Sequence, residues 1–310
     1  GNNIRIIDDA IVPKFPSKPR KLINLLVGFT AGFILGILVI FILEFLDKSI
    51  KSSDDLQEKL KIPFLGFVPV NKSKDMKEEY ELMLKDGNFL LAEQVRNIRT
   101  MLGFALSDDA NAPILVASSL QGEGKTHLSV NLAVAMAQTG KKVLLIDGDL
   151  RRSRLHKVFK VSNEKGLTNI WKNDEKISDF EYNVQKTNVA NLSVMTSGTR
   201  PPNPSELLNT PILEQFVKWA VKTYDFVMVD CPAVLPVSDT LLWGKYINKA
   251  VFVIKYGSTN SNLVEAAIDK IRDAEIKILG GIISQYKPKG ISSYGKYGYY
   301  KNYSYYKYEE

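Results

Sequence analysis

From residue 113 onward, short apolar runs alternate with longer segments whose apolar residues recur at helical spacing. The runs are rich in valine and isoleucine, which favour strands that are buried on both faces. They lie at residues 114–117, 142–146, 192–195, 226–229, 250–254 and 278–283. The helical segments between them include 125–139, 206–222 and 260–274. Continuous apolar strands that alternate with helices predict an α/β fold with a doubly wound, mostly parallel sheet.

The longest apolar run of the chain lies at residues 22–46. From Leu25 to Leu43 it has nineteen residues without a charge, which as a helix nearly cover a hydrocarbon layer of about 30 Å. A helix buried in a soluble core is the alternative, but uncharged runs of this length are rare outside membranes. A signal peptide is disfavoured because the run is long and no small-residue cleavage site follows it. The run therefore predicts one transmembrane helix.

The segments around the α/β region have weaker patterns. Residues 47–70 predict a short amphipathic helix followed by an extended segment that contains Pro63 and Pro69. Residues 71–87 are charged and are expected to form a linker, whereas 88–107 have the apolar spacing of a helix that leads into the α/β domain. Beyond residue 287 there is no apolar periodicity, which favours a flexible tail.

Composition adds little to this picture. The chain is 45% hydrophobic and 24% charged, which is ordinary for a globular protein with a core. Its net charge of +7 fits an anionic partner, which by charge alone is a nucleotide, a membrane surface or a nucleic acid. Cys231 is the single cysteine, so an intrachain disulfide framework is excluded.

A glycine-rich loop, SSLQGEGKTHLS, follows the predicted strand at 114–117. Gly122 and Gly124 allow backbone N–H groups to turn toward phosphate oxygens, and the helix that begins here points its positive end at the same anion. In the G-x-x-x-x-G-K-[ST] pattern the lysine, here Lys125, reaches the β- and γ-phosphates, and the hydroxyl of Thr126 binds Mg²⁺. Ser119 replaces the first glycine of that pattern. A plain glycine turn before a helix would not explain Lys-Thr at this place, so the loop predicts a nucleotide site.

Aspartates close two of the other predicted strands. Asp147 and Asp149 end the strand in VLLIDGDLRR, and Asp230 ends the strand in FVMVDCPAV. Because ligands bind at the carboxyl ends of parallel strands, we expect these side chains near the phosphate loop. Carboxylate oxygens are the hard ligands that Mg²⁺ prefers. Each aspartate alone has an alternative role as the cap of the next helix, but three of them beside a phosphate loop favour a metal site.

Together these residues resemble the bacterial tyrosine kinases, or BY-kinases, of capsule and exopolysaccharide export. Gly122–Thr126 resembles the Walker A motif, LLIDGDLR the acidic Walker A′ motif, and FVMVD the Walker B motif. The segment SGTRPPNPSELL and the tyrosine-rich end of the chain are similar to parts of the same family. IIDDAIVPKFPSKP resembles the end of the family's extracellular polysaccharide co-polymerase region. The resemblance covers about residues 3–310.

The resemblance implies an ATP-dependent protein tyrosine autokinase with a P-loop NTPase-like domain. It would use ATP and Mg²⁺ to phosphorylate its own C-terminal tyrosines in trans, within a ring-shaped homo-oligomer, and so regulate polysaccharide polymerisation and export. A cognate phosphotyrosine phosphatase and polysaccharide polymerisation and export proteins are the implied partners, and no nucleic acid is expected. The protein would lie in the bacterial cell (inner) membrane with its kinase domain in the cytoplasm, where ATP is found. The implied parts are an extracellular juxtamembrane end at 1–21, a transmembrane helix at 22–46, a cytoplasmic linker at 47–87, a kinase domain at 88–286 and a tyrosine-rich tail at 287–310.

The resemblance also implies residue roles. Lys125 neutralises phosphate charge and Asp147 accepts the phenolic proton. Asp149 and Asp230 hold Mg²⁺ through water, and Thr126 is a direct metal ligand. Either Arg151 or Arg152 holds the acceptor chain or a phosphate. The implied nucleotide contacts are Gly122, Glu123, Gly124, Lys125, Thr126 and His127, and the implied subunit contacts are Glu93, Arg96 and Arg99 of an E-x-x-R-x-x-R pattern. Spacing alone would equally fit a solvated charged face for that pattern.

Eight of the fourteen tyrosines lie within the last seventeen residues. Each added phosphate brings about −1.5 to −2 charges, so several would turn a mildly basic tail strongly acidic. We therefore hypothesise that the tail docks on a neighbour when unmodified and is released when phosphorylated. By composition alone, a low-complexity spacer is the alternative. The expected acceptors are Tyr294, Tyr297, Tyr299, Tyr300, Tyr303, Tyr305, Tyr306 and Tyr308.

The chain departs from the family pattern at two places. Cys-Pro-Ala follows Asp230 where the family has two prolines, so Cys231 is either a reactive thiol or a packed strand-end cysteine. Ser284 replaces an asparagine that many members have near the adenine, so the base contacts stay unassigned.

Three other classes of protein compete with this interpretation. The main rival is a membrane-tethered switch ATPase of the partitioning type without kinase activity, but such proteins have a signature lysine where this chain has Leu120. A structural co-polymerase subunit that uses ATP only to assemble is disfavoured by the intact lysine and aspartates. A nucleic-acid binder is disfavoured because basic and aromatic residues interleave only in the tail.

Overall fold

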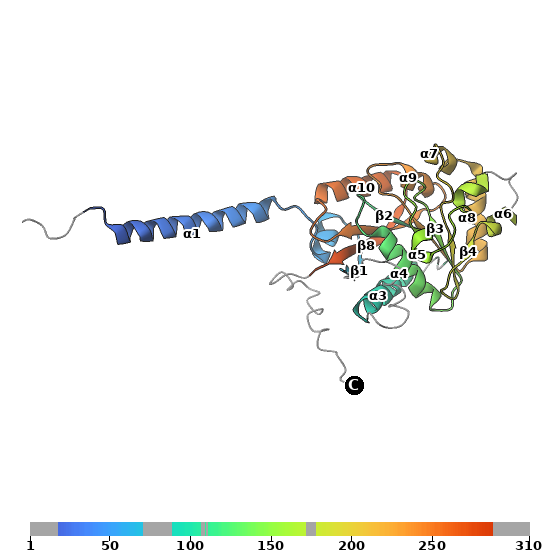
Figure 1. Cartoon of the computed structure of the whole chain (residues 1–310), viewed down its shortest axis with the longest axis horizontal. Helices are drawn as coiled ribbons and strands as arrows, with labels where there is room; N and C mark the ends of the chain where they lie inside the picture. The colour runs from blue at the N-terminus through green and yellow to red at the C-terminus, as the bar shows by residue number, and fades with distance from the viewer. Residues whose placement is uncertain (1–17, 71–88, 107–108, 110, 172–177, 288–310) are drawn as a thin grey trace, which may run out of the picture. The chain divides into compact units, whose positions relative to one another are not determined.

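A computed structural model of the protein describes residues 18–70, 89–106, 109, 111–171 and 178–287. The chain divides into two compact units, residues 1–48 and 49–310. The only helix described in the first unit is α1, and the second unit contains the sheet and the helices that cover it (Figure 1).

The helix α1 (Lys21–Leu46) extends over 26 residues, one more than the predicted 22–46. Its leucine, isoleucine, valine and phenylalanine side chains are exposed along its whole length, and none of its residues is buried. The hydroxyl of Thr30 donates to Leu26 O at 2.9 Å, so this polar group is satisfied within the helix. By length and composition, α1 could cross a membrane.

The second unit alternates strands and helices, as the apolar pattern predicts. Its strands are β1 (Phe64–Pro69), β2 (Ile114–Ser118), β3 (Val143–Asp147), β4 (Gln185–Lys186), β5 (Leu192–Met195), β6 (Phe226–Asp230), β7 (Lys249–Lys255) and β8 (Lys277–Tyr286). Its helices are η1 (Asp55–Lys59), α3 (Phe89–Ala105), α4 (Lys125–Ala137), α5 (Leu155–Phe159), η2 (Leu167–Trp171), α6 (Ser178–Tyr182), α7 (Pro204–Leu208), α8 (Pro211–Thr223), α9 (Asp239–Gly244) and α10 (Ser261–Asp273).

Within the described residues the strands form one sheet in the order β1-β8-β7-β2-β6-β3-β5-β4. Every neighbouring pair is parallel except β4 with β5. The strands β2, β6 and β3 are adjacent at the centre, and Asp147 at the end of β3 is the register partner of Asp230 at the end of β6. The predicted fold class, a doubly wound and mostly parallel sheet, is confirmed.

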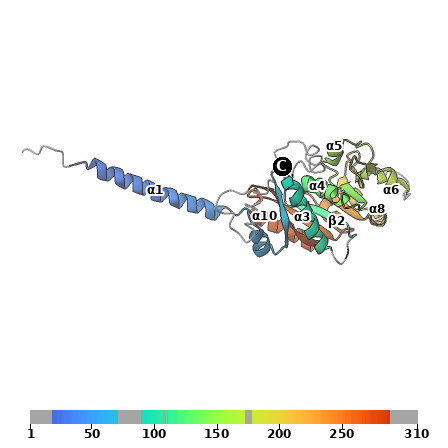
Figure 2. The same ribbon diagram turned by 90° about the horizontal axis from the view of Figure 1, so that it is seen from below.

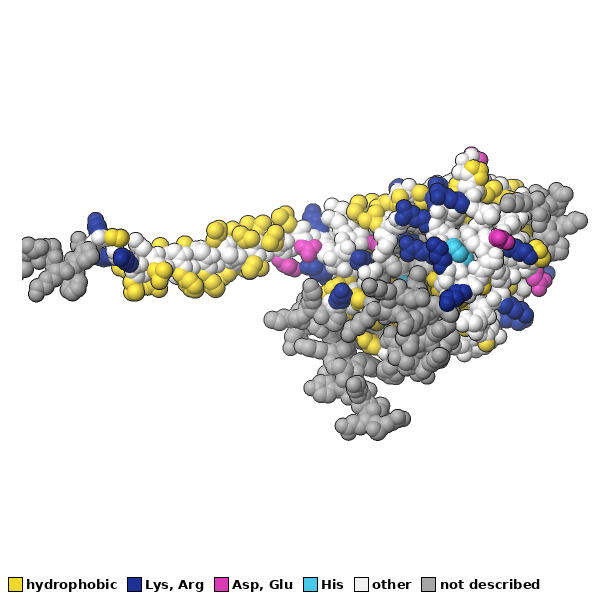
Figure 3. Space-filling model, viewed as in Figure 1, with side chains coloured by type: hydrophobic (Ala, Val, Ile, Leu, Met, Phe, Trp, Pro, Cys, Tyr) yellow, Lys and Arg dark blue, Asp and Glu magenta, His cyan; other side chains and the backbone are white. Residues whose placement is uncertain are grey.

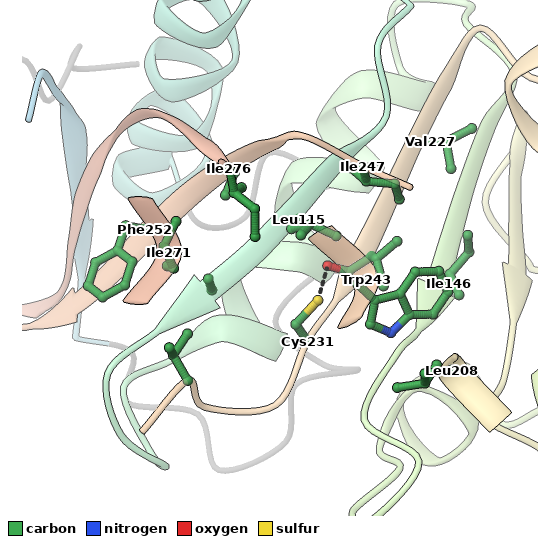
Figure 4. Packing of buried hydrophobic residues seen from close by; sticks show 14 of the residues in the cluster. Leu115, Ile146, Leu208, Val227, Cys231, Trp243, Ile247, Phe252, Ile271 and Ile276 are labelled. Carbon is green, nitrogen blue, oxygen red and sulfur yellow. Dashed lines mark hydrogen bonds between the residues drawn. The ribbon is translucent and has the colours of Figure 1, made fainter. Parts of the chain in front are cut away.

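The sheet has one hydrophobic core on each face because successive residues of its strands point to opposite sides. Leu115 and Ile146 belong to the core under α8, α9 and α10, whereas Val116 and Leu145 belong to the core under α3, α4 and α5. Figures 1 and 2 show these two groups of helices on opposite faces of the sheet. In the first core, the fully buried Trp243 of α9 lies beside Ile146 (Figure 4).

One predicted helix is interrupted. The sequence pattern predicted a single helix over 206–222, but the structure has α7 and α8 with Asn209 and Thr210 between them. Pro211 is the first residue of α8. Proline lacks a backbone N–H and disfavours a helical conformation in the residue before it, so a continuous helix cannot form here.

Residues 49–70, part of the linker predicted at 47–87, are folded into the domain, and the charged residues 71–87 of that prediction lie outside the described residues. The strand β1 of the folded part pairs with β8 at the edge of the sheet. Ile50, Leu56 and Ile62 are buried in the same core as Trp243. Gly281 of β8 allows this contact, since a Cβ there would lie 2.0 Å from Leu56 Cδ2 and 2.9 Å from Ile62 Cδ1.

This packing predicts a stability effect for a change in the expected linker. We expect Ile62→Val to lower the free energy of unfolding of the domain by about 1 kcal/mol, because it removes a methyl group from a close-packed site. Thermal unfolding of the full chain measures this change. Ile40→Val, the same change on the exposed α1, should leave the transition of the domain where it was. An unchanged transition for Ile62→Val would contradict the docking of this segment.

Candidate active site

The phosphate loop connects the end of β2 to the start of α4. Gly122 and Gly124 have φ values of +80° and +92°, in the left-handed region that glycine adopts most readily. A Cβ on Gly124 would also lie 3.2 Å from the side chain of Ser284. The loop therefore has the glycine-dependent turn that the sequence predicts, at the N-terminus of a thirteen-residue helix.

The side chain of Lys125 is buried at the first position of α4. Its Nζ donates to Ser118 Oγ at 2.7 Å and to Leu120 O at 3.5 Å. Burial lowers the pKa of Lys125, and the nearby carboxylates of Asp230, Glu123 and Asp149 oppose that shift. The site therefore holds a desolvated ammonium group among carboxylates, within reach of the loop.

Asp147 and Asp230 face each other across neighbouring strands. They are 1% and 3% exposed, and Gly148 N donates to Asp230 O at 2.9 Å. Burial raises the pKa of Asp147 to about 6 and that of Asp230 to about 7, and the negative charge of Asp147 contributes to the second shift. Two buried carboxylates that disfavour each other's ionised form are a donor set that a divalent cation would stabilise, so these residues fit Mg²⁺.

Asp147 has a structural role as well. Its Oδ2 accepts from Ser153 Oγ at 2.7 Å and from the backbone N–H groups of Arg154 and Leu155 at 3.0 and 3.1 Å. Those amides lie at the start of α5, so the capping role that the sequence left as an alternative is present for this aspartate. Because one oxygen holds three donors, Oδ1 is the atom that remains for chemistry.

Asp149 and Asp230 are tied to neighbouring elements. Asp149 is half-buried, and its Oδ1 accepts from the backbone N–H groups of Arg151 and Arg152 at 3.1 and 2.9 Å. Asp230 Oδ1 accepts from Ser129 Oγ of α4 at 3.2 Å, and the Thr126 hydroxyl is a further hydrogen-bond partner of this carboxylate. Among the described residues, no three His, Cys, Asp or Glu side chains cluster closely enough to bind a metal by themselves. A metal here would therefore need other oxygen ligands, such as Thr126, water or phosphate.

Gly148 lies between the two aspartates of the Walker A′ motif and has no room for a side chain. A Cβ at this position would be 2.5 Å from Val229 Cγ1 and 3.1 Å from Asp230 O. Gly148→Ala is therefore expected to lower the free energy of unfolding by about 1–2 kcal/mol through overpacking. Denaturant titration followed by the emission of Trp243, whose Nε1 lies 3.0 Å from that added Cβ, measures the change.

A second glycine provides the control for this substitution. Gly103 lies within α3, and nothing is found within 4 Å of an added Cβ. Gly103→Ala should raise stability by about 0.5–1 kcal/mol because alanine favours the helix. If the two substitutions changed the free energy of unfolding equally, the close approach of Val229 and Asp230 to Gly148 would not control the stability of the domain.

The two arginines after Asp149 have different surroundings. Arg151 Nε donates to Asp239 Oδ2 at 2.8 Å, and Arg151 NH2 donates to Asp239 Oδ1 at 3.1 Å and to Ser205 Oγ at 2.9 Å. Asp239 is fully buried at the start of α9. Arg152 is exposed and donates to Gln121 Oε1 of the phosphate loop at 2.8 Å. Arg151 thus joins the Walker A′ segment to α7 and α9, whereas Arg152 lies at the pocket.

A pocket opens over the phosphate loop. Figure 3 shows Lys and Arg side chains gathered beside a histidine on one face of the domain. The pocket is lined by Gln121, Gly122, Gly124, Lys125, Thr126, His127, Asp149, Arg152, Arg154, Cys231 and Gln285. Glu123 is not among the lining residues, since its side chain is 2% exposed and lies behind the loop. The position of Glu123 therefore differs from that of the other expected nucleotide contacts.

Cys231 is a packed cysteine. It is 1% exposed, its Sγ lies 3.7 Å from Val229 O (Figure 4), and burial raises the pKa of its thiol well above the usual value. A thiol that stays protonated is a poor nucleophile, so the packed alternative is the one that the structure supports.

The remaining predicted residues lie away from the pocket. On α3, Arg96 NH1 and Glu93 Oε1 form an ion pair at 2.7 Å, and Arg99 NH1 donates to Ala135 O at 2.8 Å. The tail tyrosines expected as acceptors, from Tyr294 to Tyr308, lie outside the described residues.

Several contributors were missed from the sequence. Ser129 and Ser153 each donate to a site aspartate, and Thr259 and Ser284 bond to Glu123. Ser129 lies one helical turn after Lys125, a spacing that could have indicated it. Ser153 and Thr259 have no local pattern that marks them, and Ser284 was noted only as the replacement of a family asparagine and not as a partner of Glu123.

Comparison with known proteins supports the resemblance. A family model described as "AAA domain" matches residues 113–243, and one described as "G-rich domain on putative tyrosine kinase" matches residues 1–45. A Klebsiella pneumoniae protein named "Putative tyrosine-protein kinase in cps region" is 31% identical over 306 residues, which are 94% of this chain and 42% of that protein. The chain thus spans less than half the length of this relative.

Two further proteins match a smaller part of the chain and are covered almost completely by it. The tyrosine-protein kinase YwqD of Bacillus subtilis is 39% identical over 211 residues, which are 68% of this chain and 86% of that protein. The solved kinase domain of the Escherichia coli tyrosine kinase ETK superposes with a TM-score of 0.70 at 29% identity, covering 78% of this chain and 96% of that domain. The AAA domain matched at residues 113–243 implies nucleotide binding. On these matches in sequence and in structure, the chain belongs to the bacterial tyrosine kinases of capsule and exopolysaccharide regions, the BY-kinases.

Proposed function

We propose that this chain is the membrane-anchored kinase part of a protein tyrosine autokinase that transfers phosphate from ATP to its own C-terminal tyrosines. The observation that carries the proposal is the meeting of the phosphate loop, the buried Lys125 and three strand-end aspartates at one edge of the sheet. The names of the relatives add the class of reaction, and the tyrosine-rich end of the chain supplies acceptors.

ATP and Mg²⁺ are the proposed cofactors. The loop amides from Gly122 to Thr126 and the ammonium of Lys125 would bind the phosphates, beside the ring of His127. The Thr126 hydroxyl would be a direct ligand of Mg²⁺, with Asp149 and Asp230 holding it through water. Bound there, the metal would neutralise charge on the phosphates. Glu123 would act through its backbone, because its carboxylate does not line the pocket.

Asp147 is the proposed general base. A phenol with a pKa near 10 is almost fully protonated at neutral pH, so a carboxylate that accepts its proton during transfer is useful. Asp147 has a pKa of about 6, which keeps it mainly ionised at pH 7 and makes it a stronger base than an ordinary aspartate. The proton would go to Oδ1, since Oδ2 already holds three donors.

Of the two arginines that the sequence left open, Arg152 is the proposed contact to the acceptor chain or to a phosphate. It is exposed at the pocket, whereas Nε and NH2 of Arg151 are engaged with Asp239 and Ser205. The acceptors would be tail tyrosines of a neighbouring subunit.

A ring-shaped homo-oligomer would bring that neighbour within reach, and α3 is the proposed contact. Glu93, Arg96 and Arg99 lie on this helix, which also exposes Leu90, Met101 and Phe104. Phe104 is 71% exposed, and large apolar side chains on one helix surface are typical of a contact between proteins.

We further propose that α1 crosses the bacterial inner membrane and that the second unit lies in the cytoplasm, where ATP is available. Phosphorylation would regulate polysaccharide polymerisation and export together with proteins of that machinery, and a phosphotyrosine phosphatase would reverse it. The relative from a cps region and the match of residues 1–45 support this setting.

Intact-mass spectrometry of the full chain, incubated with Mg-ATP in detergent, tests the proposal. A ladder of added phosphates that peptide mapping assigns to residues 292–310 is expected. Consumption of ATP with no added phosphate would instead identify a partitioning-type switch ATPase. A chain that neither consumes ATP nor gains phosphate would favour the structural subunit.

A further inference from the structure

The phosphate loop is hydrogen-bonded by side chains from β8 and from the loop between β7 and α10. Three side chains from the β7–α10 loop and the end of β8 donate hydrogen bonds to it, although they lie more than 130 residues away in the chain. They are Thr259, which donates to Glu123 Oε1, Ser284, which donates to Glu123 O at 2.5 Å, and Gln285, which donates to Gly122 O at 3.2 Å.

Glu123 connects these donors to the first half of the loop. Its Oε2 accepts from Leu120 N at 2.8 Å, while its Oε1 accepts from the Thr259 hydroxyl. The residue is 2% exposed. A buried carboxylate is costly unless its oxygens find donors, so both contacts are needed to keep Glu123 in place. The carboxylate therefore fixes Leu120 relative to Thr259.

Leu120 in turn lies next to the catalytic lysine. Leu120 O accepts from Ser118 Oγ at 2.8 Å and from Lys125 Nζ at 3.5 Å. The contacts thus extend from Thr259 through Glu123 to the part of the loop that contacts Lys125.

Thr259 is itself a fixed point. It is 4% exposed, and its carbonyl accepts from Ile50 N at 3.4 Å, while Gly257 N donates to Ile50 O at 2.8 Å. Ile50 is fully buried. The loop from Gly257 to Asn260 is therefore anchored in the core of the domain. This anchoring holds the Thr259 hydroxyl within hydrogen-bond distance of Glu123 Oε1.

Ser284 holds the second half of the loop in the same way. Its side chain is buried and lies so close to Gly124 that an added Cβ there would be 3.2 Å away. The hydrogen bond to Glu123 O fixes the peptide between the two left-handed glycines. The backbone conformation that turns N–H groups toward a phosphate is thus supported on both sides of Glu123.

We propose that Thr259 and Ser284 are positioning residues of the nucleotide site, which hold Glu123 and thereby the phosphate-binding conformation of the loop. This inference rests on the proposed function, in which the loop binds the phosphates of a nucleotide. Neither residue lines the pocket over the loop, and both donate to Glu123, so we expect both to act through Glu123.

The role predicts a particular kinetic effect. Loop amides contact phosphates in the ground state and in the transition state alike, so a loosened loop weakens both equally. Such uniform loss raises KM with little change in kcat. A purely structural role would instead reduce the folded fraction, and with it the apparent kcat, and leave KM for ATP unchanged.

The test compares Thr259→Val, Thr259→Ser and Ser284→Ala with the unchanged full chain in detergent. Calorimetric titration with Mg-ADP gives the affinity, and initial rates of phosphate incorporation give KM for ATP and kcat. Thr168→Val is the control, because Thr168 of η2 is likewise a buried threonine whose hydroxyl donates a hydrogen bond, here to the backbone oxygen Thr199 O at 2.9 Å.

For Thr259→Val, which leaves a buried carboxylate oxygen without its donor, we expect Mg-ADP affinity to fall about tenfold and KM for ATP to rise in parallel. Thr259→Ser keeps the hydroxyl and should bind within about twofold of the unchanged chain. Ser284→Ala should lose roughly threefold in affinity, because its partner is an uncharged carbonyl. Thr168→Val should lower only the melting temperature.

Mg-ADP affinities of Thr259→Val and Ser284→Ala equal to that of the unchanged chain would overturn the inference. So would an equal loss for Thr259→Ser and Thr259→Val, because the hydroxyl would then not be the cause. Should Thr259→Val fail to fold, Ser284→Ala alone decides, since it removes no donor from a buried charge. An unchanged chain that binds Mg-ADP but gains no phosphate would contradict the proposed kinase function and leave the affinity comparison in force.

Discussion

Replacement of Lys125 by methionine is expected to reduce phosphate incorporation into residues 292–310 by roughly a hundredfold to a thousandfold. Methionine has a similar length but no charge, so the phosphates would lose a buried ammonium group where low polarity strengthens its field. Loss of one preorganised electrostatic contact in such a site typically costs about 3–4 kcal/mol of transition-state stabilisation. Intact-mass spectrometry after incubation of the full chain with Mg-ATP measures the loss.

The same substitution should change the stability of the domain little. Burial lowers the pKa of Lys125, which means that the folded state pays a desolvation cost for this cation. Asp230, whose pKa is about 7, can take up a proton when its neighbour is removed. The control is Lys142→Met, at an exposed lysine that directly precedes β3, and it should retain normal incorporation. Incorporation by Lys125→Met at the normal rate would contradict the assignment of this site.

The arrangement of the phosphate loop and the aspartates at one edge of the sheet was predictable because these residues follow local patterns. A strand that ends in a glycine-rich loop with Gly-Lys-Thr specifies a phosphate loop, and Asp147 and Asp230 each end an apolar run. Since parallel strands present their carboxyl ends at one edge, short segments far apart in the sequence predicted one site. The strands β2, β6 and β3 are adjacent, so their carboxyl ends do lie together, and the function of the residues there stays a prediction.

The edge strand β1 was missed for a physical reason. Pro63 directly precedes it and Pro69 is its last residue, and prolines in a short apolar run argue against a central strand. β1 lies at the edge of the sheet and pairs only with β8 among the described strands, so a proline at its end removes no second ladder bond. The pattern therefore indicated an extended segment but not the partner that makes it a strand.

The contacts that hold the site together could not be read from the sequence. Thr259 and Ser284 are single hydroxyl residues, and their role depends on the packing of the β7–α10 loop and β8 against the phosphate loop. Glu123 was expected among the nucleotide contacts because it lies within the motif, yet its side chain lies behind the loop. The motif thus predicted the backbone turn of the phosphate loop, but it did not indicate in which direction the Glu123 side chain points.

The sequence could not distinguish the roles of Arg151 and Arg152, but the structure gives the two side chains different partners. We expect Arg151→Met to lower the free energy of unfolding by about 3 kcal/mol, because it leaves the fully buried carboxylate of Asp239 without its bidentate partner. The estimate is at the low end of the usual range since Arg151 is 35% exposed and partly screened. For a domain of this size, the melting temperature should fall by roughly 6–12 °C, as differential scanning fluorimetry of the full chain would measure.

Arg152→Met is the matched comparison and should move the melting temperature by less than about 2 °C, because substitutions at exposed positions usually change stability by less than about 0.5 kcal/mol. Its effect should instead appear in the rate of phosphate incorporation, where the proposed contact to acceptor or phosphate is lost. The double variant Arg151→Met with Asp239→Asn should regain part of the lost stability, since it no longer buries an unpaired charge. If Arg151→Met and the double variant were equally unstable, packing of the arginine side chain rather than the ion pair would join the Walker A′ segment to α9.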